Sequence, residues 1–144
     1  MGLQYTEPLE HGQFEVQTVN APGAATEFTF TFNSQFKRQI IGITYRFTCD
    51  VNAATRFMNL TLDDGTNIMW RVFSGANQIA LSAINYGYAV GLGSGVFVNT
   101  NGAHIGLPYP FAAPPLSVLR SVTTNMQAGD TYTNIVITSQ LWIP

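Results

Sequence analysis

The stretch from Gln39 to Cys49, QIIGITYRFTC, decides the fold. One parity of this stretch is apolar and the other is small, polar or charged, the apolar set being Ile41, Ile43, Tyr45, Phe47 and Cys49. A period of two is typical of a β-strand with one buried and one exposed face. At about 3.3 Å per residue the strand would run roughly 36 Å, which is longer than most strands. A slip of one residue would move Thr44 and Arg46 into the core, so we expect a fixed register.

The same alternation recurs along much of the chain. It predicts further strands over residues 13–20, 26–33, 56–62, 66–73 and 131–143. In the second of these the phenylalanines Phe28, Phe30 and Phe32 are expected to point inward. In the third, Met58, Leu60 and Leu62 are expected to point inward and Arg56 outward. Asp64-Gly65 follows directly and is a strong hairpin signal.

Residues 74–113 are the hardest part of the chain to interpret. They hold seven of the thirteen glycines, which favours loops and short strands. The alternation changes parity near Ala83, where a bulge or bend is expected, and a helix over residues 76–86 is the alternative. Many short strands without a clear helix indicate an all-β protein, an antiparallel two-sheet β-sandwich of about eight or nine strands. The long connection through this region favours a jelly-roll-like order over a meander.

The expected domain organisation is simple. Residues 1–12, MGLQYTEPLEHG, show no alternation and are interpreted as an N-terminal arm. Residues 13–144 are expected to form a single β-sandwich domain. The apolar side chains of the arm, Leu3, Tyr5 and Leu9, are candidates for docking on a neighbouring subunit.

The composition is poor in charge. Charged residues make up 10% of the chain, against about 25% in typical soluble domains. Lys37 is the single lysine, although exposed sheet edges are commonly protected by lysine and other charges. We therefore expect partners to cover much of the surface, with a homo-oligomer among them. The net charge of −2 argues against nucleic acid, and no apolar run approaches the length of a membrane helix, so no membrane partner is expected.

Catalytic chemistry finds little support in the sequence. The two histidines are His11 in the arm and His104 in a glycine-rich loop, and no serine lies in a Gly-x-Ser-x-Gly motif. Cys49 is expected to be a small core residue, and the acidic pair Asp63-Asp64 is explained by the hairpin turn. We expect no enzyme activity, no metal site and no cofactor.

Several aromatic residues have competing interpretations. Tyr86, Tyr88 and Tyr109 belong either to the core, to a protein interface or to a flat sugar-binding platform. The last strand is expected to have two apolar faces, with Ile135, Ile137 and Leu141 on one and Tyr132, Val136 and Trp142 on the other. Two apolar faces indicate a central position in a sheet or a subunit interface, so the second set is a candidate interface.

The last third of the chain resembles a known family. The segments GLPYP (residues 106–110), PL (115–116) and LRSVTTNMQAGDTY (119–132) are similar to small β-sandwich head decoration, or cement, proteins of tailed bacteriophages. The resemblance covers roughly residues 105–143. It implies a jelly-roll-like subunit, often a homotrimer, that clamps neighbouring major capsid proteins on the surface of the virion head. The family has no catalytic residues to transfer to this chain.

These observations lead to two expected functions. The first is a structural virion protein, a capsid decoration or cement subunit that stabilises the shell. The alternative is a sugar- or receptor-binding β-sandwich module of a phage attachment structure in the tail.

The arm provides a first test. Deleting residues 1–12 should leave the melting temperature of the subunit unchanged, because this segment offers no periodic apolar face to its own core. The deletion should abolish assembly, as measured by sedimentation with and without the arm. A subunit that unfolds on deletion would show that the arm belongs to the core.

Overall fold

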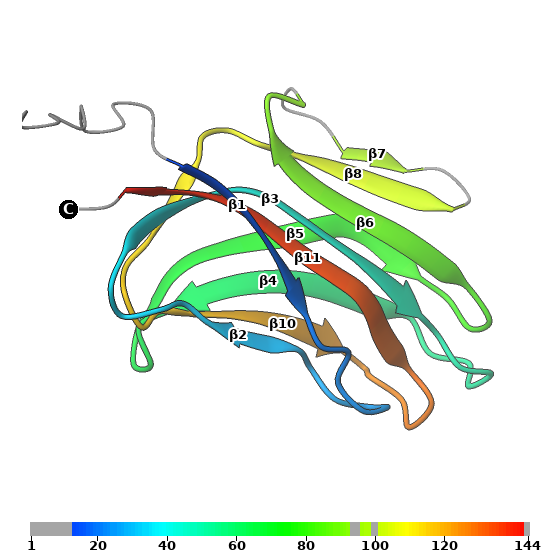
Figure 1. Ribbon diagram of the computed structural model, residues 1–144. Coiled ribbons are helices and arrows are strands. Elements are labelled where there is room, and N and C mark those ends of the chain that lie inside the picture. Colours follow the sequence, from blue (N-terminus) through cyan, green and yellow to red (C-terminus); the bar gives the residue numbers. More distant parts are fainter. Residues whose placement is uncertain (1–12, 93–95, 99–100, 143–144) are drawn as a thin grey trace, which may run out of the picture.

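The computed structural model describes residues 13–92, 96–98 and 101–142. The arm proposed for residues 1–12 therefore lies outside the described residues. Eleven strands follow in order: β1 (Gln13–Val19), β2 (Thr29–Thr31), β3 (Lys37–Thr48), β4 (Arg56–Asp63), β5 (Ile68–Gln78), β6 (Ala83–Val90), β7 (Val96–Val98), β8 (Gly102–Leu107), β9 (Phe111–Ala113), β10 (Val118–Thr124) and β11 (Thr131–Trp142). Figure 1 shows them as two stacked layers.

The strand order is that of a jelly roll. One sheet has seven strands in the order β1-β11-β3-β6-β8-β7, with β9 pairing with β3, and the other has four in the order β2-β10-β4-β5. Leaving out β7, β8 and β9, the remaining eight strands are ordered 1-8-3-6 and 2-7-4-5 along the chain. Two Greek keys wound together give this order. The expected all-β, jelly-roll-like sandwich is confirmed, with eleven strands in the described residues where about eight or nine were expected.

The insertion between β6 and β10 departs from the purely antiparallel expectation. The chain leaves β6, forms β7 at the edge of the sheet, and returns as β8 in the gap between them. β8 consequently runs parallel to β6 and antiparallel to β7.

The alternative helix over residues 76–86 is wrong, because β5 and β6 occupy that range on either side of a short turn. In the described part of the chain there is no helix long and apolar enough to cross a membrane.

The core lies between the two sheets and is rich in aromatic rings. Tyr45 stacks on Tyr86 with ring centroids 5.1 Å apart, and Tyr132 meets Phe28 edge to face at 5.3 Å. The hydroxyl groups of Tyr45 and Tyr88 share a hydrogen bond of 3.0 Å, which satisfies polar atoms that burial would otherwise leave unpaired. Cys49 is 3% exposed, as expected, and burial raises the pKa of its thiol.

The central strand β3 contains an irregularity that its sequence does not reveal. Ile43 is buried as expected, but Ile40 is also buried and Ile41 is only half-buried. The register with β11 shifts between the pairs Gly42–Thr138 and Ile40–Ser139, which places one extra residue in β3. The uninterrupted alternation expected from Ile41 onward is therefore wrong at its first residue, because a bulge inverts the parity there.

A second bulge changes the interpretation of β11. Its register with β3 shifts between Thr133 and Val136, and Asn134 there has a left-handed φ of 52°. Asparagine tolerates this conformation better than most residues. Because of the bulge, Tyr132 on one side and Ile135 on the other both point into the core, and Tyr132 is 0% exposed. Its assignment to a candidate interface is wrong.

Arg56, at the start of β4, was expected to point outward and is instead fully buried. Its Nε and Nη2 groups donate to the two carboxylate oxygens of Asp130 at 2.9 and 2.8 Å. Nη2 also donates to Asp50 at 2.5 Å. Nη1 donates to the carbonyl oxygens of Asn52 and Ala54 at 2.8 and 2.7 Å. All five N–H groups of the guanidinium are thus satisfied.

The partners of Arg56 come from two connections at one end of the sandwich, the loop between β3 and β4 and the turn between β10 and β11. Asp50 follows β3, Asn52 and Ala54 lie in the loop before β4, and Asp130 lies in the turn before β11. Asp130 also accepts hydrogen bonds from the backbone N–H of Asp50 at 2.9 Å and of Gln127 at 2.8 Å. We call Arg56, Asp50 and Asp130 the ionic clamp. It ties β3 and β11 of one sheet to β4 of the other.

Replacing Arg56 with methionine tests the ionic clamp. The variant Arg56→Met should lower the free energy of unfolding by about 3–5 kcal/mol, because it leaves the buried Asp130 carboxylate without its counter-charge. Arg71→Met is the matched control, since Arg71 is exposed and should change stability by no more than about 0.5 kcal/mol. Urea unfolding of both variants measures the difference, and equal stabilities would contradict a structural role for the clamp.

Candidate interaction surface

The edge strand β1 presents its apolar side chains to solvent. Phe14 and Val16 are 68% and 67% exposed. On the opposite face, Glu15 forms an ion pair of 3.0 Å with Arg38, whose side chain is almost fully buried. Among the described residues β1 pairs only with β11, so its other edge carries open backbone N–H and C=O groups. Apolar residues thus face outward on an unprotected sheet edge, an arrangement typical of an interaction surface.

Other charged side chains also form ion pairs or hydrogen bonds within the subunit. Arg120 pairs with Asp63 at 2.6 Å and lowers the pKa of that carboxyl group. The Glu27 carboxylate accepts hydrogen bonds from the Ser121 hydroxyl and the Thr123 backbone N–H, both at 2.5 Å. Within residues 13–92, 96–98 and 101–142, the cations that form no ion pair are Lys37, Arg46 and Arg71. The surface therefore carries fewer free charges than the composition alone suggests.

Both ends of the sandwich expose apolar side chains on connecting segments. Ile79 and Leu81 lie in the turn between β5 and β6, and Leu116 lies in the connection between β9 and β10. Leu81 and Leu116 have left-handed φ angles of 58° and 64°. This conformation is uncommon for a bulky residue and costs of order 1–3 kcal/mol. The fold therefore holds exposed leucines in strained positions at both ends.

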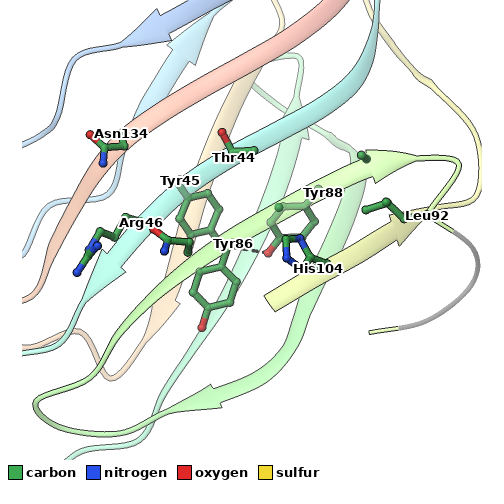
Figure 2. A pocket seen from close by; sticks show the side chains of 11 residues that line it. Thr44, Tyr45, Arg46, Tyr86, Tyr88, Leu92, His104 and Asn134 are labelled. Carbon is green, nitrogen blue, oxygen red and sulfur yellow. Dashed lines mark hydrogen bonds between the residues drawn. The ribbon is translucent and has the colours of Figure 1, made fainter. Parts of the chain in front are cut away.

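A shallow hollow of about 300 Å³ lies on the outer face of the seven-stranded sheet. It is centred on Gly87 of β6, between Thr44 of β3 and His104 of β8, its direct neighbours in the register. Figure 2 shows Thr44 and His104 on the strands that flank β6. A Cβ atom on Gly87 would lie 3.1 Å from His104 Nδ1. The missing side chain lets the imidazole lie close to β6 and leaves the hollow open.

The lining of the hollow is polar at one end and apolar at the other. Arg46, Asn85 and Asn134 contribute a guanidinium and two amides, and Leu92 contributes an exposed apolar side chain. No acidic residue is among the described residues that line it. The hollow therefore offers donors and a positive charge to a ligand or to a partner chain.

The hollow is continuous with the exposed side of β1. Val16 pairs with Thr138 of β11, which pairs with Gly42 of β3, which pairs with Ala89 at the hollow. Directly opposite residues of antiparallel strands lie on the same face of a sheet. We call this continuous surface, from Phe14 and Val16 to the hollow, the outer face.

The candidate sugar platform does not exist as predicted. Tyr86 and Tyr88 lie in the core at 1% and 0% exposure, and burial raises the pKa of both phenols. They cannot stack on a ligand from outside, because their rings point between the sheets. Tyr109 is 61% exposed, with its ring 5.1 Å from that of Phe111. Of the three residues of the predicted platform, Tyr109 alone is exposed enough to contact a sugar.

The remaining candidate interface residues have different placements. Val136 is half-buried on the outer face, where it pairs with Thr44. Leu3, Tyr5 and Leu9 lie outside the described residues, and so does the side chain of Trp142. Sequence reasoning missed Phe14, Val16 and the hollow. The alternation of β1 was visible, but only the pairing of Glu15 with Arg38 shows which side faces inward.

The described part of the chain contains no cluster of side chains that could bind a metal ion. No set of three or more His, Cys, Asp or Glu side chains gathers there. His104, expected in a loop, lies in strand β8 and lines the hollow.

Comparisons with known proteins gave one structural likeness. No protein family matches the sequence, and no curated protein matches it. The structure is similar to the D431N mutant VP2 protein of infectious bursal disease virus, from derived T=1 particles, with a TM-score of 0.40 and 12% sequence identity. The similarity covers 97% of this chain and 35% of the viral chain, so this chain spans about a third of that protein's length.

The exposed residues of β1 can be tested directly. The double variant Phe14→Ser with Val16→Thr should keep its free energy of unfolding within about 1 kcal/mol, because both side chains are mostly in solvent. It should bind less of a dye specific for exposed apolar surface. A matched double variant in the core, Ile43→Thr with Ile137→Thr, should instead unfold the subunit. A large loss of stability from the β1 variant would show that its apolar residues belong to the core.

Proposed function

We propose that this chain is a structural virion protein, a decoration or cement subunit that binds the major capsid protein on the surface of a phage head and stabilises the shell. The observation that carries the proposal is the orientation of the edge strand β1. Its apolar side chains Phe14 and Val16 lie in solvent, and its charged Glu15 points inward to Arg38. A free monomer with this edge would be prone to association, so a partner should cover it.

Three further features support the proposal. The exposed leucines at both ends of the sandwich provide additional apolar contacts away from β1. The ion pairs within the subunit leave little charge to keep a monomer soluble. Residues 105–143 resemble head decoration proteins in their strand and turn pattern. We further propose that the subunit acts by binding rather than catalysis, and that it works as a homo-oligomer, with a trimer favoured.

Weak individual contacts are sufficient for such a role. A trimer that engages several equivalent capsid sites gains affinity from multivalency, since each contact after the first is effectively intramolecular. Decoration would then be saturable, and the number of bound subunits would follow the symmetry of the shell.

The proposal is tested by removing the protein from heads and adding it back. Purified protein should rebind saturably and should raise the temperature at which the heads disrupt. The double variant Phe14→Ser with Val16→Thr should rebind less tightly, whereas Arg71→Ser on the other sheet should behave as wild type. Absence of rebinding by the wild-type protein would contradict the cement function.

A receptor-binding module is the second candidate. The hollow favours it, because donors from Arg46, Asn85 and Asn134 surround a cavity large enough for a small polar ligand. Binding to host-surface glycans, lost on Asn85→Ala but unchanged on Tyr109→Ala, would support a receptor site at the hollow. Loss on Tyr109→Ala alone would assign glycan binding to the exposed tyrosine.

A further inference from the structure

The charges of this chain are divided unevenly along its length. The chain has eight acidic and six basic residues, and all six basic residues lie after residue 12. Glu7 and Glu10 are the two acidic residues before that point, so residues 13–144 carry no net charge and residues 1–12 carry the whole net charge of −2. An acidic segment joined to a neutral domain should be attracted to any unpaired cation on that domain.

The hollow supplies such a cation. Arg46 is exposed and forms no ion pair with any described residue. The Asn85 and Asn134 amides beside it add hydrogen-bond donors, and His104 adds an imidazole. The chain before Gln13 leads into β1, an edge of the sheet whose outer face holds this hollow.

The length of residues 1–12 restricts which copy can reach the hollow. Gln13 is level with Leu141 and, through it, with Arg38 of β3. Arg46 lies eight residues further along β3, which corresponds to about 26 Å along the strand and about 28 Å with the two strand spacings included. Three extended residues span at most about 11 Å and six at most about 22 Å. Even with extended side chains, Glu10 cannot reach the Arg46 of its own chain. Glu7 could do so only with the backbone and both side chains fully extended.

We infer that residues 1–12 of one subunit dock on the outer face of a second copy, with Glu7 or Glu10 bound at Arg46 in the hollow. The apolar residues of the segment, Leu3, Tyr5 and Leu9, then have Leu92 and the shallow floor around Gly87 and Ala89 to pack on. Each subunit would offer one segment and one hollow, and such head-to-tail contacts close into a ring when the rotation permits. The inference rests on the oligomeric part of the proposed function and can fail separately from capsid binding.

Charge reversal tests the inference on the purified full-length protein, without any shell present. Analytical ultracentrifugation should show wild-type oligomers that weaken as salt is raised. Arg46→Glu should weaken self-association about tenfold, and so should Glu7→Lys with Glu10→Lys. Combining all three substitutions should restore most of the lost affinity. Arg71→Glu, an exposed arginine on the other sheet, is the matched control and should associate as wild type.

Cross-linking then shows whether residues 1–12 bind the hollow of their own chain or that of a second copy. In the double variant Glu10→Cys with Arg46→Cys, oxidation should join separate chains, and the native Cys49 should stay unreactive because it is buried. A cross-link within one chain would contradict the inference, as would a wild-type protein that remains monomeric or a charge reversal that the compensating variant does not rescue. If the oligomer persists in every charge variant, copies associate through another surface and the inference is wrong. Capsid rebinding is measured separately, so its loss alone leaves this inference standing.

Discussion

The five N–H groups of Arg56 set the constraint on which the rest of the structure depends. A buried guanidinium is tolerated only when its charge is paired and every donor is satisfied. Arg56 meets this condition through Asp130, Asp50 and two loop carbonyls, which come from two separate connections. Because these connections belong to both sheets, satisfying one side chain fixes how the sheets meet at that end of the sandwich. The core of tyrosines and phenylalanines then fills the space between them.

The same use of charge explains the character of the surface. Arg56, Arg38 and Arg120 all pair with carboxylates of the same subunit. With so few charged residues in the chain, these pairs leave large parts of the outside uncharged, and Phe14 and Val16 project from an unprotected edge. Such a surface is costly for a free monomer and useful for a subunit that is covered in its working state. This distribution supports the proposed role of a subunit covered by partners, and the polar hollow adds a specific contact to a mostly uncharged surface.

Much of the fold could be predicted from the sequence, and the exceptions have physical causes. Alternation located the long strands, because a half-buried strand must alternate, and the long connection through residues 74–113 favoured a jelly-roll-like order. The bulges at Ile41 and Asn134 were not visible, since an extra residue is recognised only against its partner strand. The first inverted the parity at Ile41, so Ile40 and not Ile41 is buried. The second turned Tyr132 from a candidate interface residue into a core residue.

The site was harder to predict because its parts are distant in sequence. Arg56 shares the parity of the buried Met58, Leu60 and Leu62 but was expected to face outward. Its burial depends on Asp130, which lies 74 residues away. Tyr86 and Tyr88 could belong to either face, and only the two packed sheets assign them to the core. The hollow requires Thr44, Gly87 and His104 to be neighbours, which depends on the parallel pairing of β6 with β8. No local pattern reports such a pairing.

Hydrogen–deuterium exchange, compared between the free protein and the protein bound on purified heads, tests most directly whether the outer face is covered in the virion. The open-edge amides of Gln13–Val19 should exchange quickly in the free subunit and become protected on the head. The amides on the open edge of β5 should change less. Equal exchange of β1 in both states, with new protection confined to the four-stranded sheet, would contradict the account.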